Sequence, residues 1–278
     1  MAKFITGKEL IAVIDSVIWD AEEQLIIVSP YVKLDAHFKT LFEKHKERYD
    51  LHICIVFGKN DGNTARSMSK ADFEFFTGFN NVSIIHESNL HAKYYGNELM
   101  GVVTSINLYD HSFQNNIEFG VLLESKLLDG IFSASADILA WEEAQKIADN
   151  GEVVFIKRPV VKSGFFTNKE IGARVLYDNT ESFFTPGARK KNVTDRLGDF
   201  PDKVDADDDM PVRASVAVAE KGYCIRTGKE IPFNPKRPYS AEAYQSWAAY
   251  KNPDYKEKYC HKTGKPSNGK TSMKNPIL

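Results

Sequence analysis

The sequence has few of the residues that staple or anchor a protein. It contains three cysteines, Cys54, Cys224 and Cys260, among 278 residues. Three thiols cannot build the disulfide framework of a secreted protein, so we predict a reduced, cytoplasmic protein. The sequence also lacks the run of about 18 apolar residues that a membrane-spanning helix needs. Its first residues predict an amphipathic helix and not a signal peptide.

Net charge is also small, but charge is unevenly distributed along the chain. Lys and Arg number 36 against 38 Asp and Glu, which gives a formal net charge of −2. Residues 221–278 hold 12 Lys and Arg against 4 Asp and Glu, a charge of +8, so residues 1–220 carry −10. A basic segment rich in aromatic residues suits contact with a polyanion. Alternatively, the aromatic residues form a small core and the lysines keep it soluble.

Apolar residues in the first 150 positions alternate between strand and helix patterns. Thr6 and Glu9 have the spacing of a capping box at the start of an amphipathic helix. Further helices are predicted at 34–46, 68–79 and 131–148, and strands at 25–28, 51–57, 82–85 and 119–123. This alternation predicts an α/β fold with a mixed β-sheet flanked by helices.

The chain is predicted to have four parts. Residues 1–150 form the α/β domain, and residues 151–186 form a β extension that belongs to it or stands alone. Residues 187–220 combine a basic patch with an Asp-rich run, which predicts an exposed connector. Residues 221–278 form a small basic, aromatic domain.

Polar residues two positions apart recur between residues 91 and 118. The pairs are His91 with Lys93, Ser105 with Asn107, and Asn116 with Glu118. Apolar runs and the turn signal Gly96-Asn97 predict a hairpin with His91 on a strand, where residues two apart share a face. A neutral imidazole is a nucleophile, a lysine is a fixed cation, and Ser and Asn donate hydrogen bonds to anionic oxygens. The set suits a phosphate, with Glu118 accepting a hydrogen bond from the second nitrogen of His91.

A plainer interpretation of part of this set also stands. His91 and Lys93 can be a solvated surface pair, and Glu98 can face Lys93 across the hairpin in a salt bridge. The complete set favours the phosphate site. A single pair of this kind is common in proteins, whereas five such residues, His91, Lys93, Ser105, Asn107 and Glu118, rarely occur together within one hairpin by chance.

The order His-x-Lys, acid, Ser-x-Asn, Asn-x-Glu resembles the signature of the phospholipase D superfamily. Glu98 stands where that family has Asp, and Thr104 stands where it has Gly; Glu98 and Asn116 would have supporting roles. The resemblance implies a phosphodiesterase in which His91 attacks phosphorus and a second His91 protonates the leaving oxygen. It further implies that Lys93, Ser105 and Asn107 hold the phosphate oxygens. No metal ion and no cofactor are implied.

The chain holds one copy of a motif that the superfamily uses in pairs. The resemblance therefore implies a homodimer with the site on its two-fold axis. Single-motif members of this size resemble bacterial nucleases, including restriction-type ones, which predicts an endonuclease acting on DNA or RNA. One alternative is a phospholipase D-type lipid hydrolase or transferase, although no membrane-seeking amphipathic segment is found. The other is a noncatalytic nucleic-acid-binding protein of the same fold.

The last segment contains an internal repeat, Tyr223–Lys229 and Tyr259–Lys265. Each copy resembles a zinc-ribbon knuckle whose second Cys has become Thr. Cys224, Cys260 and His261 supply at most three of the four ligands of a structural zinc site, so we predict a degenerate, metal-free ribbon, with zinc binding as the alternative. The candidate nucleic-acid contacts are Lys229, Lys236, Arg237, Lys262 and Lys265, and the tail can also serve to dock a partner protein.

Overall fold

The computed structural model describes residues 2–58, 64–109, 117–124, 135–162, 169–184, 195–208, 213–214 and 221–278. The chain divides into two compact units. The first comprises Met1–Lys191 and Arg196–Ser215, and the second comprises Asn192–Asp195 and Val216–Leu278. None of the helices within the described ranges is long and apolar enough to cross a membrane.

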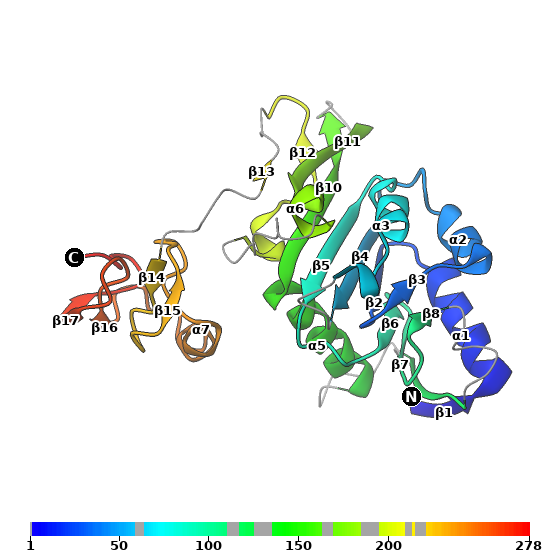
Figure 1. Cartoon of the computed structure of the whole chain (residues 1–278), viewed down its shortest axis with the longest axis horizontal. Coiled ribbons are helices and arrows are strands. Elements are labelled where there is room, and N and C mark those ends of the chain that lie inside the picture. The colour runs from blue at the N-terminus through cyan, green and yellow to red at the C-terminus, as the bar shows by residue number, and fades with distance from the viewer. Residues whose placement is uncertain are drawn as a thin grey trace. The chain divides into compact units, whose positions relative to one another are not determined.

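One mixed β-sheet runs through the first unit (Figure 1). Its strands are β1 (Ala2–Thr6), β2 (Gln24–Val28), β4 (His52–Gly58), β5 (Val82–Glu87), β6 (Tyr94–Asn97), β7 (Met100–Thr104), β9 (Phe119–Glu124), β10 (Glu152–Lys162), β11 (Lys169–Asp178), β12 (Val204–Asp205) and β13 (Arg213–Ala214). They lie in the order β1-β9-β7-β6-β2-β4-β5-β10-β11-β13, and β12 pairs with β10. Strands β2, β4 and β5 are parallel, whereas β6, β7, β9 and β1 are antiparallel to their neighbours. Two short strands, β3 (Val32–Lys33) and β8 (Leu108–Tyr109), pair apart from this sheet.

Helices cover both faces of the sheet. One buried apolar cluster joins it to α1 (Gly7–Trp19), α2 (Ala36–Glu43), α3 (Lys70–Thr77) and α6 (Thr180–Phe184), and a second cluster joins the opposite face to α5 (Ala136–Asn150). Short 3-10 turns lie at Thr64–Arg66 (η1) and Leu197–Asp199 (η2). Within β2, Leu25 and Ile27 belong to the first cluster, and Ile26 and Val28 to the second. Both faces are buried, as the unbroken apolar run predicts, and the mixed α/β fold is confirmed.

The helix starts were predicted with mixed success. At α3, the Ser69 hydroxyl accepts a hydrogen bond from the backbone N–H of Asp72 at 3.1 Å, and this cap starts the helix close to the predicted residue 68. The predicted capping box at α1 is wrong. The Thr6 side chain makes no cap hydrogen bond, and Glu9 instead pairs with Lys3 on β1. The edge strand β1, which the apolar pattern did not predict, brings Lys3 to this position.

Residues beyond 150 continue the main sheet. β10 pairs with β5, and β11 pairs with β10, so this segment is part of the first unit. The predicted exposed connector, 187–220, is also not a free linker where it is described: β12 and β13 add parallel pairings to β10 and β11. An exposed strand offers unpaired N–H and C=O groups to any nearby backbone, whatever the side chains are. An Asp-rich composition therefore did not predict these pairings.

The second unit is built from the two copies of the repeat. β14 (Lys221–Tyr223) pairs with β15 (Glu230–Pro232), β16 (Glu257–Tyr259) pairs with β17 (Pro266–Thr271), and α7 (Ala241–Ala248) lies between these hairpins in sequence. Gly228 and Gly264 close the two knuckles at φ values of 72° and 67°, which favour glycine. Gly264 lies against the ring of Tyr223, and Gly228 lies against the ring of Tyr259. Each copy thus packs on the other.

Candidate active site

Three segments of the chain between residues 91 and 118 carry the candidate site residues to one edge of the main sheet. The parallel strands β2, β4 and β5 end there, at Val28, Gly58 and Glu87. At the same edge, β6 begins at Tyr94 and β7 ends at Thr104. The carboxyl ends of parallel strands are where open α/β sheets bind their ligands.

His91 and Lys93 lie just before β6, and not on a strand as predicted. The chain is still aligned with β7, because the Lys93 carbonyl accepts a hydrogen bond from the N–H of Thr104 at 3.2 Å. The Lys93 ammonium donates to the His91 carbonyl at 3.0 Å, which holds its charge beside His91. His91 is exposed, so its imidazole is accessible to a large substrate.

The hairpin turn lies two residues later than predicted. Gly96 and Asn97 belong to β6, and Glu98 and Leu99 form the turn. The Asn97 side-chain oxygen accepts hydrogen bonds from the N–H groups of Leu99 and Met100, each at 2.9 Å. Gly96 is needed inside the strand for packing, because a Cβ there would collide with the Tyr94 ring. A Gly-Asn pair therefore predicted the hairpin, but not its register.

Ser105 and Glu118 are brought together by the pairing of β7 with β9. The Ser105 N–H donates to the Phe119 carbonyl at 3.1 Å, and the Phe119 N–H donates to the Ser105 hydroxyl at 3.2 Å. The Ser105 hydroxyl in turn donates to the Glu118 carboxylate. The structure gives the His91 ring no hydrogen bond with any described residue, so the predicted bond to Glu118 is not formed within this chain. Ser105 is the closer partner because the ladder places it beside Glu118.

Asn107 is half-buried, as are Lys93, Ser105 and Glu118. Its side-chain oxygen Oδ1 is buried and has no hydrogen-bond partner among the described residues. Leaving a buried acceptor unpaired costs about 1–3 kcal/mol, and such groups need an explanation such as a ligand donor. Asn116, the remaining predicted residue, lies outside the described residues.

A buried polar network beneath the site was not predicted. The Tyr95 hydroxyl donates to the Ile106 carbonyl at 2.8 Å, and the Ser29 hydroxyl accepts a bond from the N–H of Leu108 at 3.1 Å. Burial raises the pKa of Tyr95, and the nearby Glu118 charge raises it further, so the hydroxyl remains a donor. These bonds fix the segment that carries Ser105 and Asn107. A Tyr within an apolar strand looks like any core residue, so no sequence signal distinguished it.

Glu98 supports the fold at the opposite edge of the sheet. Its carboxylate accepts backbone hydrogen bonds from Glu22 at 2.8 Å, Glu23 at 3.2 Å and Gln24 at 3.1 Å. Burial raises the pKa of Glu98, but these N–H donors outweigh burial and bring it below its ordinary value. The alternative salt bridge with Lys93 does not fit, because the two residues flank β6 at opposite ends.

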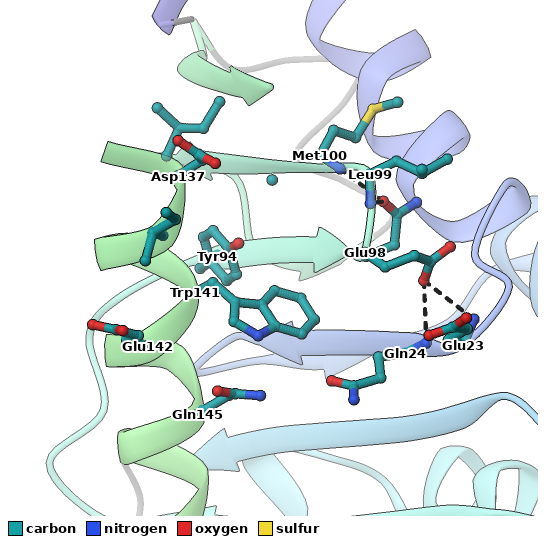
Figure 2. Close-up of a pocket in the computed structure, with 14 residues that line it drawn as sticks. Glu23, Gln24, Tyr94, Glu98, Leu99, Met100, Asp137, Trp141, Glu142 and Gln145 are labelled. Atoms are coloured by element: carbon teal, nitrogen blue, oxygen red, sulfur yellow. Dashed lines mark hydrogen bonds between the residues drawn. The ribbon is translucent and has the colours of Figure 1, made fainter. Parts of the chain in front are cut away.

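A groove lies between α5 and the β6–β7 hairpin, with a volume of about 450 Å³. Figure 2 shows Trp141 extending from α5 over the sheet beside Tyr94, with Glu98 and Glu23 at the hairpin end and Asp137 on α5. The described residues that line it include four acids and no Lys or Arg. Such a groove repels phosphate, so it is separate from the candidate active site.

In the second unit, the imidazole of His261 is fully engaged. Nδ1 donates to the Tyr223 carbonyl at 2.7 Å, and Nε2 accepts from the N–H of Asn234 at 2.7 Å. A zinc ligand needs a free nitrogen lone pair. Within the part of the chain that the structure describes, no group of three or more His, Cys, Asp or Glu residues is placed to hold a metal ion.

The two threonines that replace knuckle cysteines have an identifiable role. Burial raises the pKa of the Cys224 thiol, but the Thr227 hydroxyl and neighbouring backbone N–H groups outweigh burial and lower that pKa. Burial raises the pKa of Cys260, but the Leu278 N–H at 3.4 Å and the Thr263 hydroxyl outweigh burial and lower it to about 7. Hydrogen-bond donors thus stabilise the thiolate form of Cys260, whose counterpart in a zinc ribbon is stabilised by the metal ion.

The predicted nucleic-acid contacts of this unit lie on its surface. Lys229, Lys236, Lys262 and Lys265 are exposed, and Arg237 is half-buried. Lys229 lies 3.9 Å from the carboxylate of Glu242. Their role in binding remains a prediction.

Neither the models of protein families nor the curated proteins contain a match to this sequence. Among solved structures, the chain is similar to Nuc from Salmonella typhimurium, a phospholipase D family member, at 15% identity and a TM-score of 0.42, covering 55% of this chain and 98% of that one. NucT from Helicobacter pylori matches at 13% identity and a TM-score of 0.43, covering 54% and 97%. Phosphatidylserine synthase from Haemophilus influenzae matches at 17% and 0.42, covering 55% and 39%. The case for a function comes from the chain's own residues.

Proposed function

We propose that this chain is a phosphodiesterase that cuts DNA or RNA, with His91 as its nucleophile. The observation that carries the proposal is the convergence of three chain segments at the carboxyl edge of the sheet. They bring an exposed imidazole, an adjacent ammonium and the hydrogen-bonded pair Ser105–Glu118 to one place. This combination suits nucleophilic attack on a phosphate and stabilisation of its oxygens.

The proposed reaction has two steps. A neutral His91 nitrogen attacks phosphorus, the bond from phosphorus to the leaving oxygen breaks, and a second imidazole protonates that oxygen. Water then attacks the phosphorus of the phosphohistidine while the second imidazole takes its proton; the phosphorus–nitrogen bond breaks, the phosphate product leaves and His91 returns to its free form. Lys93 and the Asn107 amide hold the non-bridging oxygens throughout, and Ser105 joins them when its single hydroxyl proton turns from Glu118 to the substrate. The unpaired Oδ1 of Asn107 is suited to accept a hydrogen bond from the bound substrate or the attacking water.

A second copy of the chain would supply the second imidazole. Val103 and Phe4 both lie opposite Val121 in the sheet, so these three share a face, and Phe119 is two residues from Val121 on the same strand. Phe4, Val103 and Phe119 are 64%, 45% and 51% exposed, and the rings of Phe4 and Phe119 stack with centroids 5.7 Å apart. An exposed apolar patch of this kind favours protein association. It adjoins Ser105 and Glu118, which suits a two-fold site.

The test is cleavage of labelled single- and double-stranded DNA and RNA in excess EDTA. Wild type should cut at least one of them, and His91→Ala should not. Lipid vesicles assayed in parallel distinguish a lipid enzyme. Cutting that persists in His91→Ala would refute the proposed nucleophile.

The dimer has its own test. Phe119→Asp should yield monomers in sedimentation and lose cleavage, because a charge in the patch opposes its burial. Leu139→Asp on α5, at a residue that is 53% exposed, is the matched control and should remain dimeric. A monomeric wild type with full activity would refute the two-chain site.

A further inference from the structure

Five planar groups in the second unit form one stacked column. The Arg226 guanidinium lies over the rings of Tyr255 and Tyr239, with centroid distances of 5.5 Å and 5.3 Å. Tyr239 stacks on Trp247 at 5.9 Å, and Trp247 stacks on Tyr244 at 5.7 Å, both with an interplanar angle of 28°. The column therefore runs Tyr255, Arg226, Tyr239, Trp247, Tyr244.

Hydrogen bonds fix the middle of the column. The buried carboxylate of Glu257 accepts bonds from the Arg226 side chain, with Nε at 3.0 Å, and from the Tyr239 hydroxyl at 3.0 Å. The Trp247 indole N–H donates to the Asn252 carbonyl at 2.9 Å. Because these groups are already ordered, a ligand that stacks on the column does not have to immobilise them.

The two ends of the column are exposed while its centre is buried. Tyr244 and Tyr255 are 40% and 55% exposed, against 4% for Tyr239. The sequence left open whether the aromatic residues of this segment contact a polyanion or form a small core. Tyr239 belongs to a small core. Tyr244 and Tyr255 instead present rings to solvent.

The surrounding charge favours an anionic ligand. Three of the four acids of residues 221–278 are paired with bases: Glu230 with Lys221 at 2.9 Å, Glu242 with Lys229 at 3.9 Å, and Glu257 with Arg226. Exposed lysines flank the Tyr255 end in sequence, namely Lys251, Lys256 and Lys258. Phosphate neutralisation by such lysines supplies sequence-independent affinity for nucleic acid.

We infer that the second unit binds single-stranded nucleic acid by stacking bases on the exposed rings of Tyr244 and Tyr255. Unpaired bases offer their faces to aromatic side chains, whereas bases within a duplex are already stacked on each other. The inference rests on the proposed function in one respect, since the strand held here would be the substrate of the first unit. Stacking tolerates any base, so the unit would hold the strand and leave sequence choice elsewhere.

The test uses the full chain carrying His91→Ala, so that binding is measured without cleavage. Its affinity for fluorescein-labelled oligothymidylate is followed by anisotropy. Tyr244→Leu and Tyr255→Leu should each weaken binding about tenfold, within the range for loss of one base stack. Tyr244→Phe keeps the ring and should bind like its parent. The matched control is Tyr250→Leu, at a residue that is 85% exposed and outside the column, and it should leave affinity unchanged.

Three results would overturn the inference, provided that circular dichroism shows the variants folded. They are unchanged affinity in both column variants, an equal loss in Tyr250→Leu, and equal competition by an abasic oligonucleotide that retains only phosphates and sugars. Cleavage by the chain with His91 intact separates the two proposals. Binding that depends on the column without any cutting would reject the nuclease, and cutting with column-independent binding would reject only this inference.

Discussion

Replacing Glu98 should lower stability and leave chemistry intact. Its carboxylate accepts three backbone N–H groups at 2.8–3.2 Å. Hydrogen bonds to a charged group contribute about 1.5–3 kcal/mol each when buried. Residues 22–24 are exposed, so water can replace the lost acceptor and most of that contribution disappears. We therefore expect Glu98→Gln, which loses the charge and one acceptor, to cost about 1–2 kcal/mol in unfolding free energy.

The measurement is urea unfolding followed by tryptophan fluorescence. A Trp247→Phe background removes the signal of the second unit, so that Trp19 and Trp141 report on the first unit alone. Turnover is measured in parallel on the chain that retains Trp247. Glu98→Gln should retain kcat within a factor of about two, because the residue lies at the edge of the sheet opposite His91.

The pH dependence gives a second criterion. The pKa of Glu98 is lowered from its ordinary value of 4.5, so its stabilisation is fully present above that value and is lost as pH falls through the lowered pKa. The gap between wild type and Glu98→Gln should therefore narrow below pH 4.5. A large loss of kcat with unchanged stability would show that Glu98 acts on the chemistry, and a gap independent of pH would show that its charge is not what matters.

Three further perturbations follow from individual contacts. Burial lowers the pKa of His52 to about 3, so the unfolded state binds more protons below pH 6.5. The free energy of unfolding should therefore fall from pH 7.5 to 5.5, by up to about 1.4 kcal/mol per pH unit, and urea midpoints that stay constant over this range would contradict this. Gly101→Ala places a methyl against the Tyr94 ring and should lower the free energy of unfolding by about 1–3 kcal/mol. Adding Tyr94→Leu removes the ring, so the double variant should regain part of that stability. Thr263→Val removes a donor from the sulfur of Cys260 and should raise its pKa above about 7, which ultraviolet thiolate absorbance would detect as a later titration.

Much of the fold was predictable because both faces of its central strands are buried. The apolar runs around Ile27 and Ile55 lie in the sheet at the predicted positions. The outer strands of the sheet were not predictable. β1 exposes Phe4, and β12 and β13 pair through backbone groups, which no pattern of side chains reveals. Apolar sequence patterns indicate which residues are buried. The outer strands are only partly buried, so their pattern is weak.

The segments that form the candidate site were predictable from the sequence, and their side-chain contacts were less so. Ser105 lies directly after β7, where a short chain segment has several donors within reach of one carboxylate. Glu118 pairs with Ser105 and not with His91, and Glu98 pairs with the backbone of residues 22–24 and not with Lys93. Which donor a carboxylate meets depends on the register of strand pairing. At the β6–β7 hairpin the observed turn lies two residues later than the predicted one.

Because Glu118 is bonded to Ser105, the proposed two-chain site predicts how activity should change on dilution. Within one chain, the described residues provide no group that orients the His91 ring, and the mechanism needs a second imidazole. If a second chain supplies it across the Phe4–Val103–Phe119 patch, specific activity should fall when the protein is diluted below its dimer dissociation constant. Excess His91→Ala chains should then capture wild-type chains in dimers that hold one imidazole, and lower their activity. Specific activity that resists both dilution and the inactive chain would mean that one chain carries a complete site, and that the exposed patch has another purpose.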